Sequence, residues 1–138
     1  MTKFIWMAVC FLSTESWTVA QSDGSEYLRG QVFMDVAKAE KRWGSASADV
    51  SKFASGSLAE RARMASSFVR SKSMNGKNSQ EVRQVLGPFT GHFWSTQVPA
   101  YILEEGWRKN QDTWQLVFLL DDSGKIKEAR IHRNCCPK

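Results

Sequence analysis

The sequence predicts an α+β fold in which helices pack on one face of an antiparallel sheet of three or four strands. The period of the apolar residues carries this prediction: it is three to four positions in the first part of the chain and two positions in the later part. Apolar residues make up 42% and charged residues 24% of the 138 residues, which excludes a mostly disordered chain. The length predicts one small domain with extensions.

The first twenty residues have the pattern of an export signal. Lys3 precedes an uncharged apolar run over residues 4–12, and the segment ends in Ala20, a small residue that signal peptidase favours. Nine helical residues rise ~14 Å, about half of the ~30 Å hydrocarbon core, so no transmembrane span is expected. Cys10 lies inside the run, so the pattern does not indicate lipid attachment. We expect residues 1–20 to be a signal peptide, cleaved after Ala20, and the mature protein to be periplasmic or secreted.

Residues 21–57 are predicted to contain an N-terminal helix and a linker. Apolar residues recur at spacings of four, four, three and four, which predicts a helix over 26–43; they are Leu28, Val32, Val36, Ala39 and Trp43. Residues 45–57 hold five serines and one glycine, a composition typical of a flexible linker.

An α+β domain is predicted over residues 58–133, and its first helix begins with a capping box. Ser57 can accept a hydrogen bond from the backbone of Glu60, while the Glu60 side chain reaches back to Ser57. One face of this helix is apolar, formed by Leu58, Ala62, Ala65 and Val69.

The next helix is short and has clear signals at both ends. Asn78 and Glu81 are spaced as a second capping box. Gly87 suits the position after the last helical residue, and Pro88 cannot continue the helix. We expect the helix to end at Leu86.

A strand meander is predicted after Pro88. Alternating apolar residues indicate strands over 89–94, 98–104 and 114–120, and a last strand over 126–132. Residues 121–124 read Asp-Asp-Ser-Gly, which predicts the turn between the last two strands.

The segment around the second capping box resembles a family motif. The motif residues are Gly76, Asn78, Glu81, Val82, Leu86, Gly87 and Pro88. In this order they resemble the core of the SmpA/OmlA (BamE-like) family, although Pro88 comes one residue early. The resemblance implies the fold of the β-lactamase-inhibitory protein repeat and a role in binding other proteins during outer-membrane assembly.

The sequence contains two histidines, His92 and His132, and neither lies in a known catalytic motif. Neither belongs to a G-x-S-x-G or H-E-x-x-H motif, and no glycine-rich phosphate loop occurs. We therefore predict no enzymatic activity, no catalytic residue and no cofactor.

The charge pattern argues against a nucleic-acid partner. The net charge is +5, but acidic and basic residues are interspersed, without a run of five like charges. We expect a solvated mixed surface. Cleavage after Ala20 would remove Lys3 and Glu15 together, so the mature chain would keep the same net charge.

The chain ends in a tail, 134–138, that contains Cys135 and Cys136. Together with His132 they provide too few ligands for a zinc site, so no metal is predicted. Neighbouring cysteines form only a strained ring with each other. In an oxidising compartment they are candidates for a disulfide, including one that links two chains as a dimer.

Aromatic residues near the predicted strand connections are the candidates for partner binding. They are Trp94, Tyr101 and Trp107, the last flanked by Arg108. Aromatic and Arg side chains contribute strongly to protein interfaces.

Three hypotheses for the function follow. The first is an exported, non-enzymatic protein-interaction module that binds another envelope or secreted protein, as in envelope assembly. The second is an exported inhibitor that blocks a soluble enzyme with the concave sheet of the same fold. The third, a basic nucleic-acid-binding protein, holds only if the chain is not exported.

Overall fold

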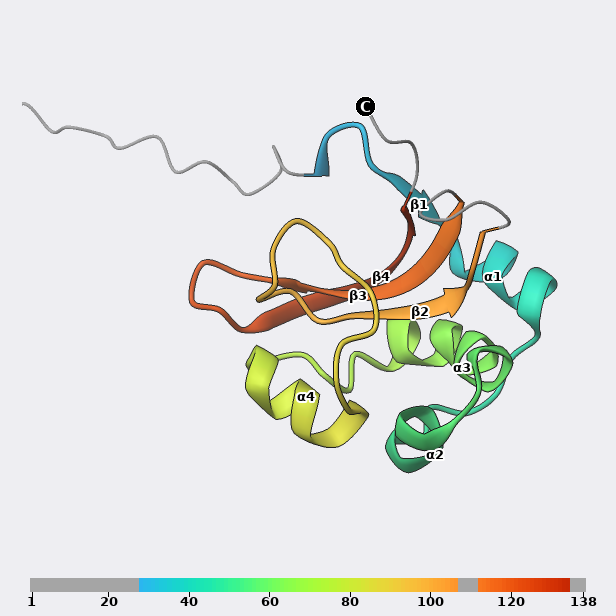
Figure 1. Cartoon of the computed structure of the whole chain (residues 1–138), viewed down its shortest axis with the longest axis horizontal. Coiled ribbons are helices and arrows are strands. Elements are labelled where there is room, and N and C mark those ends of the chain that lie inside the picture. The colour runs from blue at the N-terminus through green and yellow to red at the C-terminus, as the bar shows by residue number, and fades with distance from the viewer. Residues whose placement is uncertain (1–27, 107–111, 135–138) are drawn as a thin grey trace, which may run out of the picture.

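The computed structural model describes residues 28–106 and 112–134, and these form one layer of helices against one sheet (Figure 1). The elements in chain order are β1 (Val32–Met34), α1 (Val36–Trp43), α2 (Val50–Ser55), α3 (Leu58–Ser71), α4 (Ser79–Leu86), β2 (Ala100–Glu104), β3 (Thr113–Leu120) and β4 (Ile126–Asn134). The described strands are all antiparallel to their neighbours, in the order β1-β4-β3-β2. The predicted α+β class is confirmed.

The main core lies between the helices and the sheet. Four aromatic rings at its centre meet edge to face: Phe53 with Phe68 at 5.0 Å, Phe53 with Tyr101 at 5.4 Å, and Phe68 with Phe118 at 6.4 Å between centroids. All four are fully buried. The rings come from α2, α3, β2 and β3, so this cluster ties the helical layer to the middle of the sheet.

The predicted helix over 26–43 is wrong in its first half. Gly30 adopts a φ of +77°, and Val32–Met34 then form β1, which pairs with β4 at the edge of the sheet. Only Val36–Trp43 are helical. The regular apolar spacing joined residues of two elements by coincidence: Val32 in β1 is exposed, whereas Ala39 in α1 is buried.

The predicted flexible linker over 45–57 is also wrong, because part of it folds as α2. Asp49 caps this helix by accepting a hydrogen bond from the backbone of Lys52 at 3.0 Å. Phe53 then enters the main core, and the Ala46 backbone bonds to α3. The described part of segment 21–57 thus packs against the described residues of segment 58–133.

The predicted strand over 89–94 is wrong as well. Residues 88–99, which we name the crossing loop, pass around the β2 edge of the sheet (Figure 1). Phe89 packs against the helical core, whereas Phe93 packs on the opposite face of the sheet. The alternation of aromatic residues therefore marks a crossing from one face to the other.

The predicted strands over 98–104, 114–120 and 126–132 are confirmed, with small shifts at their ends. The turn over 121–124 is confirmed too, since the backbone N–H of Gly124 donates to the Asp121 carbonyl at 3.0 Å. Among the described residues, no helix is both long and apolar enough to cross a membrane.

The family-like motif builds α4 and joins it to the sheet. Asn78 and Glu81 form the predicted capping box, and Val82 and Leu86 are fully buried. Gly87 ends the helix with a φ of +87°, a conformation that favours glycine.

The first and last motif residues act at the ends of this segment. The Gly76 backbone N–H donates to the Ile126 carbonyl at 2.8 Å, which attaches the segment before α4 to the start of β4. Pro88 is exposed and begins the crossing loop. Each motif residue thus has a structural role.

Candidate functional site

The crossing loop covers the face of the sheet that the helices leave open (Figure 1). Phe93 and Val98 of the loop form a second apolar cluster with Ala100, Val117 and Leu119 of the sheet. The sheet is therefore covered on both faces in its centre, by helices on one side and by the loop on the other.

Backbone hydrogen bonds fix the loop along the edge strand β2. The backbone N–H groups of Thr90 and Gly91 both donate to the Ala100 carbonyl, at 3.1 and 2.9 Å. The Ile102 N–H donates to the Thr90 hydroxyl at 2.9 Å. These bonds satisfy groups that an edge strand otherwise exposes to another chain.

A buried glutamine holds the loop from below. Gln115 of β3 accepts from the His92 backbone N–H at 3.1 Å and donates to the His92 carbonyl at 2.8 Å. The same amide lies so close to Gly91 that a Cβ there would collide with the Gln115 Oε1. Gly91 is thus required by a close approach.

His132 of β4 completes this polar cluster beneath the loop. Gln115 Nε2 lies 3.0 Å from His132 Nδ1, and Gln31 Oε1 lies 2.7 Å from His132 Nε2. Because Gln115 Oε1 accepts from His92, its Nε2 must donate, so Nδ1 accepts and Nε2 carries the proton. Burial, with the Phe93 ring 4.6 Å away, favours this neutral form and lowers the pKa of His132 to about 4.

Trp94 stands at the tip of the loop in a strained conformation. The Ser95 N–H donates to the Phe93 carbonyl at 2.6 Å, which closes a γ-turn with Trp94 at its centre and a φ of +60°. Such turns are rare and strained, and a positive φ is unusual for a bulky residue. Trp94 is nevertheless 68% exposed, whereas the other exposed large apolar side chains of the described residues reach 36–39%.

Two adjoining hollows, which we name the loop groove, lie between α4 and the crossing loop. The larger has a volume of about 370 Å³ and the smaller about 220 Å³, and both are lined by Arg83, Phe89 and Thr96. The remaining lining residues are Ser79, Gln80 and Gln97 on one side and Gly91, His92, Ser95 and Val98 on the other. The groove is largely polar, and Ser95, the residue after Trp94, forms part of its wall.

Arg83 gives the loop groove its charge. Its guanidinium carbon lies 4.4 Å from the centroid of the Phe89 ring, within the range of a cation–π contact. Phe89 itself meets the buried Tyr101 edge to face at 5.7 Å. No residue that lines the groove carries a carboxylate.

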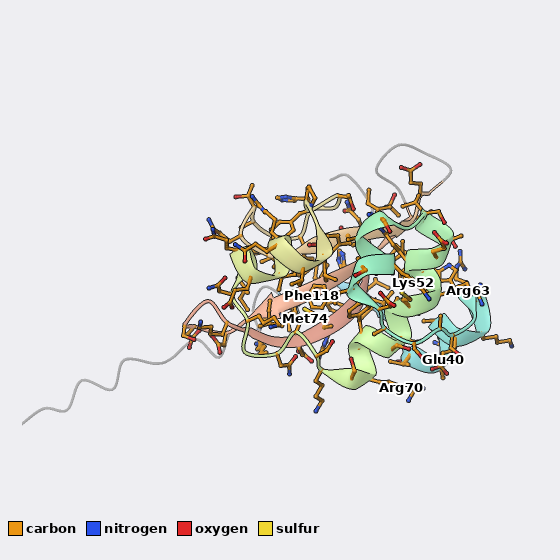
Figure 2. The ribbon with its side chains drawn as sticks, turned by 90° about the horizontal axis from the view of Figure 1, so that it is seen from below. Glu40, Lys52, Arg63, Arg70, Met74 and Phe118 are labelled. Atoms are coloured by element: carbon orange, nitrogen blue, oxygen red, sulfur yellow. The ribbon has the colours of Figure 1, made fainter. Side chains whose placement is uncertain are left out.

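Another hollow, on the helical side of the molecule, differs from the loop groove in the charges that line it. It has a volume of about 450 Å³ and lies between segment 46–49, α2 and α3. Lys52 and Arg63 (Figure 2) line it together with Asp49 and Glu60, so both signs of charge are present.

The structure corrects one predicted partner-binding residue. Tyr101 is fully buried, and its hydroxyl donates to the Gly87 carbonyl at 2.8 Å, where it supports the end of α4. Burial raises the pKa of this phenol above its ordinary value. Tyr101 is therefore a core residue, whereas Trp94 lies on the surface as a binding residue must.

The other predicted binding residues, Trp107 and Arg108, lie outside the described residues, as do Cys135 and Cys136. His132 was considered with these cysteines as a potential zinc ligand, but it is buried in β4 and belongs to the polar cluster beneath the loop. Across residues 28–106 and 112–134, no three His, Cys, Asp or Glu side chains lie close enough together to hold a metal.

Sequence reasoning missed Arg83, Phe89 and the buried Gln115. A signal for the last was present, because Gln115 interrupts an otherwise apolar run in β3. Arg83 and Phe89 meet only because the chain reverses at Gly87, and their spacing is not a helical one.

No protein-family model, curated protein or solved structure matches this chain, so the likeness to the SmpA/OmlA family rests on its motif residues.

Proposed function

We propose that this protein is an exported, non-enzymatic protein-binding module that uses the crossing loop to bind another envelope or secreted protein. A role in envelope or outer-membrane assembly is the form of this function that the likeness to the SmpA/OmlA family suggests. The observation that carries the proposal is Trp94, a largely exposed tryptophan on a strained turn.

The construction around Trp94 supports a binding role. Backbone strain persists only where the surroundings hold it, and it is concentrated at functional sites. Here Phe93 is buried on one side of Trp94, and the Gln97 N–H bonds to the Ser95 hydroxyl at 3.2 Å on the other. A tryptophan presented in this way loses little conformational freedom on binding, which favours its use as an interface anchor.

The surroundings of the histidines support a non-enzymatic role. His132 contacts two amides rather than a nucleophile and an orienting carboxylate, the partners that a catalytic triad needs. Its buried, neutral form holds the loop on the sheet, which is a structural task.

The inhibitor alternative loses its main argument. It requires a free concave sheet face, but the crossing loop covers the centre of the face opposite the helices. The nucleic-acid alternative requires an unexported chain. N-terminal sequencing of the protein from its native cell tests that point: a start at Gln21 supports export, and an intact Met1 or Thr2 start contradicts it.

A photo-crosslinking residue at position 94 tests the binding surface. Position 50 on α2 provides a matched control, because Val50 is an exposed apolar residue at 38% and lies on the helical side. We expect one discrete crosslinked protein from position 94 and none from position 50. Equal crosslinking from both positions, or none from either, would contradict the proposal.

A further inference from the structure

The geometry of the loop groove points to the chemistry of the partner. We propose that this groove binds the carboxylate of an Asp or Glu side chain in an extended acidic segment of the partner protein, with Arg83 as the charged donor. This inference rests on the proposed function and adds the chemical class of the bound segment.

Arg83 is prepared for a carboxylate by its contact with Phe89. The guanidinium carbon lies 4.4 Å from the centroid of the Phe89 ring, and a guanidinium group in such a contact can still donate hydrogen bonds from the N–H groups at the edge of its plane. A carboxylate accepts two parallel hydrogen bonds from such an edge, and this pairing is stronger than a bond between neutral groups. The contact between Phe89 and the buried Tyr101 fixes the ring, so Arg83 loses less freedom on binding.

The charge of Arg83 has no counterpart in the walls of the groove. No carboxylate lines the groove, and the adjacent Glu81 accepts a hydrogen bond from the Asn78 backbone at 2.7 Å within the capping box. The hollow on the helical side, in contrast, contains Asp49 and Glu60 beside its Lys52 and Arg63. Charge complementarity therefore selects an acidic group for the loop groove and none for the other hollow.

The single cation favours an acidic protein segment over a nucleic acid. A polyanion is held by several Lys and Arg contacts to successive phosphates, and the groove supplies only Arg83. The Ser79 hydroxyl already donates to the Gln97 carbonyl across the groove. The Gln80 amide and the Thr96 hydroxyl can bond a peptide backbone along the groove. Trp94 directly precedes the lining residue Ser95, so it can bury an apolar side chain of the same segment.

The test is a selection of random twelve-residue peptides displayed on phage against the purified protein. We expect the selected peptides to share an Asp or Glu next to an aromatic or aliphatic residue. Replacing that acid by its amide should weaken binding at least about tenfold, the loss expected for a charge-assisted pair.

Arg83→Gln should weaken binding by the same factor, and the amide peptide should bind this variant no worse than the acidic peptide does. Arg63→Gln is the matched control: it removes one exposed positive charge from the helical side and should leave the affinity unchanged. The urea midpoint of both variants should equal that of the wild type, since both side chains are exposed.

Three results would overturn the proposal. The first is selected peptides without a shared acid, or no selected peptide at all. The second is equal loss of affinity in Arg83→Gln and Arg63→Gln, which would indicate only long-range attraction. The third is a twelve-residue oligothymidylate that binds through Arg83 more tightly than the peptides.

Trp94→Ala separates this inference from the proposed function. If the peptides bind Arg83→Gln with unchanged affinity but bind Trp94→Ala more weakly, the carboxylate proposal is overturned and the loop is supported as the binding surface. If the affinity of the peptides is unchanged in both variants, both proposals are contradicted.

Discussion

The two faces of the sheet are covered in different ways. The helical face is packed with apolar side chains, and its centre is the edge-to-face cluster around Phe53 and Phe118. The opposite face is covered by the crossing loop, and beneath that loop lie the polar groups of Gln115 and His132. Apolar packing thus holds the helices on one face of the sheet, whereas buried polar groups help to hold a loop in one conformation on the other.

The largest expected effect concerns the helical face. Phe53→Ala should lower the free energy of unfolding by about 3–5 kcal/mol, because a fully buried phenylalanine is replaced by a cavity. Val50→Ala in the same helix truncates an exposed side chain and should change the free energy of unfolding by about 0.5 kcal/mol or less. Urea unfolding measures both. Equal midpoints would mean that α2 does not pack on the core.

On the loop face, Gln115→Leu should lower the free energy of unfolding by about 2–3 kcal/mol. The substitution leaves the backbone N–H and carbonyl of His92 and the Nδ1 of His132 without their partner. Gln84→Leu, on the exposed side of α4, is the control. If the two variants unfold at the same urea concentration, the loop is not held by this glutamine.

The pH dependence of folding stability should distinguish the two faces of the sheet further, because His132 is buried beneath the loop. The unfolded pKa of His132 is near 6.5 and the folded pKa is about 4, so between these values the unfolded chain binds a proton that the folded chain does not. Stability should therefore fall as the pH drops from about 6.5 to about 4, with no further loss from this group below that range.

His132→Leu serves as the comparison for this pH series. It should be less stable than the wild type at pH 7, because both glutamines lose their partner, but its stability should vary less between pH 6.5 and 4. Unfolding midpoints across that range provide the measurement. Identical slopes for the two proteins would exclude His132 as the source of the dependence.

The smallest expected effect is at Trp94 and has the opposite sign. Trp94→Gly should leave stability unchanged or raise it by up to about 1 kcal/mol, since glycine adopts a φ of +60° without strain. Trp94→Ala keeps the strain and is the comparison. Thermal unfolding measures both, and a lower midpoint for the glycine variant would mean that Trp94 packs as a structural residue.

The sequence predicted those parts of the fold that depend on local signals. The capping boxes of α3 and α4, the glycine after Leu86 and the concentration of apolar residues in β3 act over a few residues, and all are found. The short β1 strand was missed because its partner, β4, lies about a hundred residues away in the chain.

The candidate site was predicted only in part, for the same reason. Trp94 could be singled out as an aromatic residue near a strand, but its exposure depends on the γ-turn. Tyr101 is also aromatic but is buried, because its strand packs against α3 and its hydroxyl donates to the Gly87 carbonyl at the end of α4. Which aromatic residue reaches the surface is decided by tertiary contacts that no local pattern contains.

In the proposed function, the crossing loop binds a partner while the helical face supplies most of the stability. The most direct test of this proposal is to measure the affinity of Trp94→Ala for the protein crosslinked at position 94, together with its urea midpoint, on one preparation. We expect at least about a tenfold loss of affinity, the loss typical of an interface anchor, with an unchanged midpoint. Unchanged affinity, or an affinity that falls only in step with the midpoint, would contradict it.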